Sequence, residues 1–104
     1  MPGIDFSLLR NEISMAQVLD LLDYTPLRRI GDQLRGPCPV HGSNSSRSRV
    51  FSANLSKNAY RCFRCGSTGN QLDLWMAVRS VTVYVAAVDL SERLGVQIPW
   101  IETR

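Results

Sequence analysis

The hydrophobic pattern of the chain begins with helical spacing. Apolar side chains recur every three or four residues after position 14, and they mark one face of a helix: Met15, Val18, Leu19 and Leu22. Ser14 and Gln17 form a capping box at its start, and Pro26 follows its end near Tyr24. A helical turn over residues 5–11 is also expected.

The pattern changes between residues 34 and 63, where glycine, proline and serine indicate turns and loops. Two strands are predicted over residues 50–55 and 59–63. A turn at 56–58 joins them into an antiparallel hairpin, and a shorter strand is expected at 34–36.

Helical spacing returns after this segment. Asn70 is expected to cap a helix through about Arg79, and Thr82 a second helix that Gly95 ends after Leu94. Their apolar faces are Leu72, Trp75, Met76 and Val78 in the first and Ala86, Ala87, Leu90 and Leu94 in the second. Residues 96–99 are expected to close back onto the sheet. The chain thus predicts an α+β fold of one domain over residues 1–104, with helices on the N- and C-terminal sides of a small antiparallel sheet.

Composition narrows the class of protein. A chain of 104 residues with 44% hydrophobic and 20% charged residues suits one globular domain. A domain of this size has a limited core, which a bound metal would support. No apolar run approaches the ~18–20 residues of a membrane span, and no secretory signal is visible at the start. Three cysteines cannot all pair within one chain, so we expect a cytoplasmic protein with reduced thiols and no membrane contact.

Positive charge is concentrated in the middle of the chain. Residues 28–64 contain eight basic residues and one acid, a net charge of +7, whereas the remainder contains four arginines and eight acids, a net charge of −4. Eleven of the twelve basic residues are arginine, which suits bidentate contacts with phosphate. The pattern favours a polyanionic partner over a merely solvated basic face.

The cysteines and the only histidine form two pairs with metal-ligand spacing. Cys38-x-x-His41 and Cys62-x-x-Cys65 are separated by twenty residues, and a glycine follows each pair. Three thiolates and an imidazole, bound at about 2.3 and 2.0 Å, are typical of tetrahedral zinc; iron fits less well. Because four protein ligands leave no open position, we predict one structural zinc ion per chain, within a zinc ribbon at about residues 34–66.

Two other interpretations of these residues stay open. His41 could be an ordinary loop histidine beside buried cysteines, or Cys62 and Cys65 could be the metal-free redox pair of a thiol oxidoreductase. A closed zinc site explains more, since it uses every cysteine and histidine of the chain. With zinc bound the site carries a charge of −1, so part of the basic cluster, Arg64 above all, could serve to screen the thiolates.

Aromatic residues next to arginine on a strand can stack on unpaired bases. Alternation along the strand places Tyr60 and Cys62 on one side and Phe63 on the other. Phe51, Phe63 and Trp75 are predicted to be core residues, while Tyr60 suits the core and a binding surface equally.

The segments RGPCPVHG, VFSANLSKNAYRCFRCGSTGN and QLDLWMAV together resemble the Cys-His-Cys-Cys zinc-binding domain of bacterial and phage replicative primases. The resemblance covers nearly the whole chain. It implies a zinc ribbon that binds single-stranded template DNA and helps primase to choose where an RNA primer starts. It also implies a DNA-facing ribbon surface. Together with the charge pattern, the candidate nucleic-acid contacts are Arg28, Arg29, Arg35, Arg47, Arg49, Lys57, Tyr60, Arg61 and Arg64.

Three departures from the family pattern concern the choice of template sequence more than the fold. Arg64 stands where the family usually has glycine between the last two ligands. The loop after His41 is about three residues longer than usual, and Asp32 occupies a position that is often basic or polar.

The catalytic part of a primase is not recognisable in the sequence. No Asp-x-Asp or Glu-x-Asp pair is present to hold magnesium, and no phosphate-cradling glycine loop occurs. We therefore expect no nucleotide polymerisation by this chain alone, and a primase catalytic domain or a replicative helicase as its partner. The methionine start favours a free-standing protein over a fragment. The alternative function is a structural zinc module for protein assembly in a mobile element or replication complex, through the acidic and apolar second half.

Overall fold

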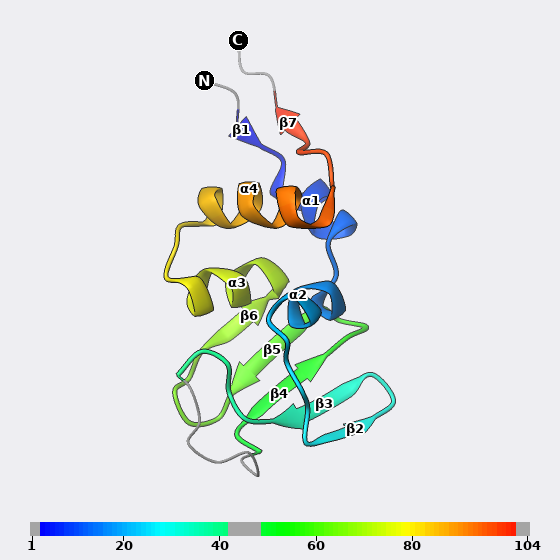
Figure 1. Cartoon of the computed structure of the whole chain (residues 1–104), viewed down its shortest axis with the longest axis vertical. Helices are drawn as coiled ribbons and strands as arrows, with labels where there is room; N and C mark the ends of the chain where they lie inside the picture. The colour runs from blue at the N-terminus through cyan, green and yellow to red at the C-terminus, as the bar shows by residue number, and fades with distance from the viewer. Residues whose placement is uncertain (1–2, 42–48, 102–104) are drawn as a thin grey trace.

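A five-stranded antiparallel sheet forms one end of the molecule, and helices stack between it and the chain termini (Figure 1). The computed structural model describes residues 3–41 and 49–101. The helices are α1 (Phe6–Glu12), α2 (Met15–Leu21), α3 (Gln71–Arg79) and α4 (Val83–Leu94). The strands are β1 (Gly3–Ile4), β2 (Arg28–Ile30), β3 (Gln33–Gly36), β4 (Phe51–Asn54), β5 (Ala59–Cys62), β6 (Thr68–Asn70) and β7 (Trp100–Ile101). The α+β prediction, with helices before and after the sheet, is confirmed.

The large sheet has the strand order β2-β3-β4-β5-β6, with every neighbouring pair antiparallel. The predicted hairpin is its centre, and the short strand expected at 34–36 is present as β3. One side of the sheet packs against helices through Leu34, Ala53 and Tyr60, which are aligned across three strands. This alignment joins the sheet to the hydrophobic core.

The predicted helix starts are confirmed in detail. Ser14 and Gln17 form the capping box of α2, and the Asn70 side chain accepts hydrogen bonds at the start of α3. Thr82 caps α4, and Gly95 ends it in the left-handed conformation that glycine adopts without strain. The turn expected at residues 5–11 is the helix α1.

A buried glutamine links the N-terminal helices to α3. The side-chain amide of Gln71 (Nε2) donates hydrogen bonds to the carbonyl oxygens of Arg10 and Ile13, at 2.9 and 2.7 Å. These carbonyls lie where α1 gives way to α2, so they lack partners within a helix. Gln71 thereby holds the junction of α1 and α2 in place on the core.

The segment after α4 corrects one prediction. Residues 96–99 do not return to the large sheet; instead, β7 pairs with β1 in a separate two-stranded sheet. The amide of Asp5 also donates to the carbonyl of Pro99 at 2.8 Å. The reason is that α4 lies beyond α3 from the sheet, so the chain that leaves it reaches the N-terminal segment first (Figure 1).

The aromatic residues are divided between core and surface differently from the prediction. Phe51 and Trp75 are fully buried, as expected, and Tyr60 joins them with only 4% of its surface exposed. Phe63 is 58% exposed, so its assignment to the core is wrong. Phe63 follows the last residue of β5 and lies on the opposite side from Tyr60 and Cys62, away from the helices.

The described part of the molecule is elongated, with extents of 50 × 26 × 20 Å. The large sheet lies at one end of the long axis and the paired strands β1 and β7 at the other (Figure 1). Among the described residues, no single helix is long and apolar enough to cross a membrane; α3 and α4 meet that test only together, across a bend of 102°.

Candidate metal centre and basic sheet face

The sheet topology brings the two ligand pairs to the same place. Because β4 runs antiparallel to both β3 and β5, the chain leaves β3 and β5 at the same edge of the sheet. Cys38 and His41 follow β3, while Cys62 ends β5 and Cys65 lies in the turn after it. Residues far apart in the sequence thus meet at one end of the hairpin.

The four side chains have the geometry of a single metal site. Their ligand atoms all lie within 4.8 Å of one another. The sulfur atoms of Cys38 and Cys65 are 4.0 Å apart, and Cys62 Sγ is 3.6 Å from His41 Nδ1. Tetrahedral zinc with bonds of about 2.3 and 2.0 Å needs separations of about 3.8 and 3.5 Å. The four residues therefore fit one zinc ion, and closed coordination makes that ion structural.

Backbone amides face two of the sulfur atoms. The amide of Val40 donates to Cys38 Sγ at 3.4 Å, and the amide of Cys65 donates to Cys62 Sγ at 3.3 Å. Burial raises the pKa of the Cys38 thiol to about 11, although the amides of His41 and Val40 act in the other direction. Burial also opposes ionisation of Cys62, but the amides of Cys65 and Arg64 outweigh it and lower the pKa of that thiol.

Zinc affinity is therefore expected to rise with pH. Zinc binds the thiolate, so each cysteine thiol that holds its proton in the metal-free chain must release it on binding. Each released proton changes the apparent affinity by about tenfold per pH unit. Zinc can be titrated into the metal-free chain by calorimetry at pH 6.5, 7.5 and 8.5. Buffers of different ionisation enthalpy then give both the zinc affinity and the number of protons released. An affinity that does not change over this range would contradict the prediction.

Gly36, two residues before Cys38, packs closely against the segment between α2 and β2. A Cβ atom at Gly36 would lie 2.6 Å from Tyr24 Oη and 3.0 Å from the amide nitrogen of Leu27. Only glycine lets β3 pass this close to the segment between α2 and β2. Gly36 thus allows the strand that leads to the first ligand pair to pack against this segment.

The other side of the large sheet carries a row of polar residues. The strand register aligns five of them across all five strands, one from each: Arg28, Arg35, Ser52, Arg61 and Thr68. Alternation along a strand puts this row on the face opposite Leu34 and Tyr60. We call these five residues the arginine row.

Phe63 packs against two members of the arginine row. The guanidinium carbons of Arg35 and Arg61 are each 5.2 Å from the centre of the Phe63 ring, within the range of cation–π attraction. Arg35 also donates to the carbonyl of Arg49 at 2.7 Å. Because the ring is 58% exposed, a base can stack at this position, either on a guanidinium plane or on the ring in place of one guanidinium group. Sequence alternation predicts this side for Phe63, and its exposure there excludes a place in the core.

The remaining candidates are not all on this face. Arg29 is aligned with Leu34, so its strand position faces the opposite side from Arg28. Lys57 lies in the β4–β5 turn, at the other end of these strands from Cys62. Tyr60 is buried and its ring stacks on Phe51 at 5.8 Å, so it offers no surface to a ligand. Arg47 lies outside the described residues.

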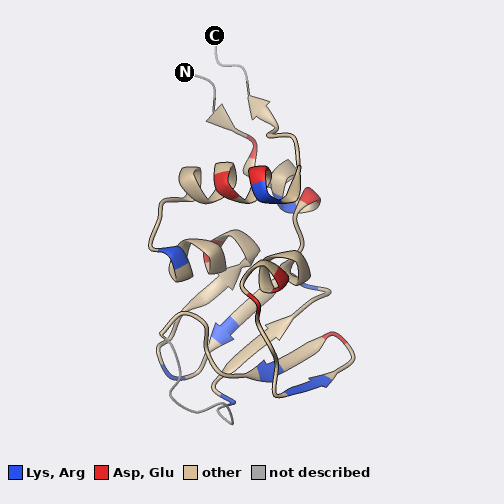
Figure 2. Cartoon of the chain, viewed as in Figure 1, with Lys and Arg blue, Asp and Glu red and all other residues tan. Residues whose placement is uncertain are grey.

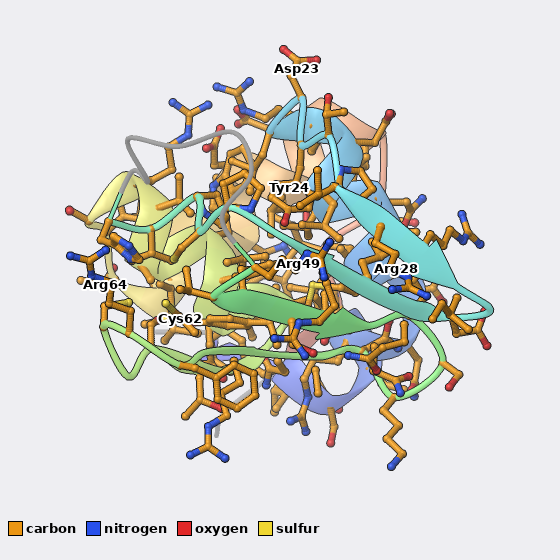
Figure 3. All side chains as sticks on the ribbon, turned by 90° about the horizontal axis from the view of Figure 1, so that it is seen from below. Asp23, Tyr24, Arg28, Arg49, Cys62 and Arg64 are labelled. Carbon is orange, nitrogen blue, oxygen red and sulfur yellow. The ribbon has the colours of Figure 1, made fainter. Side chains whose placement is uncertain are left out.

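The arginines of the sheet have no acidic partners within the described ranges. There, the single ion pair joins Arg93 and Asp89 on α4, at 2.8 Å. Figure 2 shows basic residues on the strands of the large sheet, an acidic position in the turn between β2 and β3, and residues of both charges on the helices. Figure 3, seen from the sheet end, shows Arg28, Arg49 and Arg64 spread across its width, with Cys62 on the same side as Arg64. This end of the molecule can therefore attract an anion.

Sequence comparison defines the class of protein to which this zinc ribbon belongs. Residues 4–104 match the CHC2 zinc finger family, and the chain is a member of it.

The similar proteins are DNA primases. The chain is 34% identical to the DNA primase of Treponema pallidum over 76 residues, 73% of this chain and 12% of that protein. It is 30% identical to the DNA primase of Synechocystis over 94 residues, 90% of this chain and 14% of that protein. Among solved structures, it matches the zinc-binding and RNA polymerase domains of Aquifex aeolicus primase with a TM-score of 0.70 and 28% identity. The match covers 89% of this chain and 22% of that one. The chain is thus similar to the zinc-binding region of much longer primases.

Proposed function

We propose that this chain binds single-stranded DNA on the face of its large sheet that carries the arginine row, and that it acts in primer initiation. The arginine row is the observation that carries the proposal. It places positive charge on three of the five strands, beside an exposed aromatic ring. Membership of the zinc finger family and similarity to DNA primases support the same function.

Single strands suit this face better than duplex DNA. Unpaired bases can lie flat on Phe63 and on guanidinium planes, whereas the bases of a duplex are stacked on each other. The phosphates of the strand then meet Arg28 and Arg61, which are exposed. Because each neutralised phosphate releases counterions, binding should weaken steeply with salt.

We propose that primer synthesis itself is carried out by a second domain. The sequence contains no acidic pair suited to magnesium, and the relatives that it matches are several times longer. The Aquifex aeolicus structure contains an RNA polymerase domain besides its zinc-binding domain. We propose that a polymerase domain of this kind, or a replicative helicase, is the protein partner.

Arg28→Gln is expected to weaken single-strand binding, whereas Arg29→Gln leaves it nearly unchanged. The two variants lose the same charge from adjacent positions, but only Arg28 belongs to the arginine row. Loss of one phosphate contact should lower affinity by about threefold to tenfold and flatten the salt dependence by about 0.7 in log–log slope. Fluorescence anisotropy with a labelled oligothymidylate at three salt concentrations measures both effects. Equal losses in the two variants would indicate general attraction to charge and contradict binding on this face.

A second function rests on an apolar surface at the opposite end. The rings of Tyr84 and Trp100 lie 6.3 Å apart, and Val83, Val85 and Ile101 are also exposed. An exposed cluster of this kind is typical of a protein interface. Absence of oligothymidylate binding at low salt, with zinc bound, would favour assembly as the main function.

A further inference from the structure

A hollow opens beside the metal centre, where β5 turns towards β6. It has a volume of about 380 Å³. Its lining is Arg61, Cys62, Phe63, Arg64, Cys65, Gly66 and Thr68, so it shares the ligands Cys62 and Cys65 with the metal centre. This volume is at the small end of the range for ligand pockets, about 300–1,000 Å³. The hollow is therefore large enough for one small ligand group and too small for a folded partner.

The hydrogen-bond donors of this hollow are its two arginines. The Thr68 hydroxyl donates to the Tyr60 carbonyl at 3.0 Å, and the amide of Gly66 donates to the Cys62 carbonyl at 3.1 Å. The amide of Cys65 donates to Cys62 Sγ. Arg61 and Arg64 are exposed and have no ion-pair partner among the described residues. A ligand held by two guanidinium groups next to a phenyl ring is an anion attached to a flat ring system.

We propose that this hollow holds one nucleotide of the bound strand, with its phosphate between Arg61 and Arg64 and its base against Phe63. The inference rests on the proposed function and names the residues at one end of the same face. Arg61 and Phe63 connect the hollow to the arginine row, since Arg61 belongs to that row and lies over the Phe63 ring. Arg64, which lies between the ligands Cys62 and Cys65, adds a phosphate contact that the arginine row does not include.

The competing role for Arg64 is to screen the thiolates of the metal centre. The zinc site with three thiolates carries a charge of −1, so a neighbouring guanidinium could stabilise it. The two roles predict different effects of removing the Arg64 charge. A screening arginine supports zinc retention, whereas a phosphate-binding arginine supports DNA affinity and its salt dependence.

Arg64→Gln in the zinc-bound full chain separates the two roles. We expect about threefold to tenfold weaker binding of an oligothymidylate of about twelve residues, a salt slope smaller by about 0.7, and unchanged zinc retention against a chromogenic chelator. Arg64→Lys should keep the slope and recover part of the affinity, because lysine keeps the charge but not the bidentate geometry. Arg10→Gln is the matched control, since Arg10 is exposed on α1, far from this end.

Three outcomes would overturn the inference. Unchanged oligonucleotide affinity in Arg64→Gln, with weakened affinity in Arg28→Gln, would support DNA binding on the arginine row but exclude the hollow from the binding site. Faster zinc loss in Arg64→Gln, with unchanged DNA affinity, would establish the screening role. Displacement of the oligonucleotide by free ATP, in the original chain but not in Arg64→Gln, would assign the hollow to a free nucleotide. If the original chain does not bind the oligonucleotide at low salt, the proposed function itself fails.

Discussion

Replacement of Cys62 by serine is expected to abolish zinc binding and the folded structure together. Cys62 is fully buried, ends β5 and lies among the other three ligands. Structural zinc sites contribute about 10–16 kcal/mol to the folding of small domains, and whole domains are stable by only about 5–15 kcal/mol. Loss of this thiolate should therefore remove most or all of the stability of the chain.

Metal analysis and thermal denaturation of Cys62→Ser measure this effect. We expect the zinc content to fall from one ion per chain to none, and the cooperative thermal transition to disappear. Ser67→Ala is the matched control, because Ser67 contacts Tyr60 Oη at 2.7 Å near the site but supplies no ligand. A Cys62→Ser protein with one zinc ion and an unchanged melting temperature would exclude Cys62 from the metal site.

Phe51→Ala and Phe63→Ala are expected to have opposite consequences. Phe51 is fully buried and packs against the rings of Tyr24 and Tyr60, so its truncation should cost about 3–5 kcal/mol of folding stability. Phe63 is mostly exposed, so its truncation should change stability by less than about 1 kcal/mol. Its loss should instead lower affinity for single strands by 1–3 kcal/mol, about fivefold to 150-fold.

The two phenylalanine variants control for each other, since the same atoms are removed from opposite sides of the sheet. Thermal denaturation should show a fall of more than about 12 °C for Phe51→Ala and little change for Phe63→Ala. Anisotropy with oligothymidylate should show the loss of affinity in Phe63→Ala. Normal DNA binding by folded Phe63→Ala would exclude base stacking on this ring.

The metal ligands and helix starts could be predicted from the sequence because their signals are local. A capping box spans four residues, as at Ser14, and each ligand pair also spans four. The central hairpin was predicted for the same reason, since both strands and their turn lie within residues 50–63. Such features depend little on the rest of the chain.

The features that the sequence did not predict, or predicted wrongly, depend on contacts between distant segments. β2 and β6 have only three residues each, too few for a recognisable alternation, and they are strands because β3 and β5 pair with them. The same pairing puts Arg28 and Arg29 on opposite faces. Whether Phe63 or Tyr60 faces the helices also depends on the side from which α2 and α3 pack, and no window around Cys62 contains that information.

The β4–β5 hairpin, which carries part of the proposed binding face, is held at both ends. The metal centre closes one end, and at the other the Asn58 side chain accepts a hydrogen bond from the amide of Met15 at 2.8 Å, at the start of α2. A platform fixed in this way is preorganised, so an incoming strand loses its own conformational freedom while the protein loses little. Association should therefore be fast and limited by the encounter of strand and surface. Differences in affinity between variants should then appear mainly in how quickly the strand leaves.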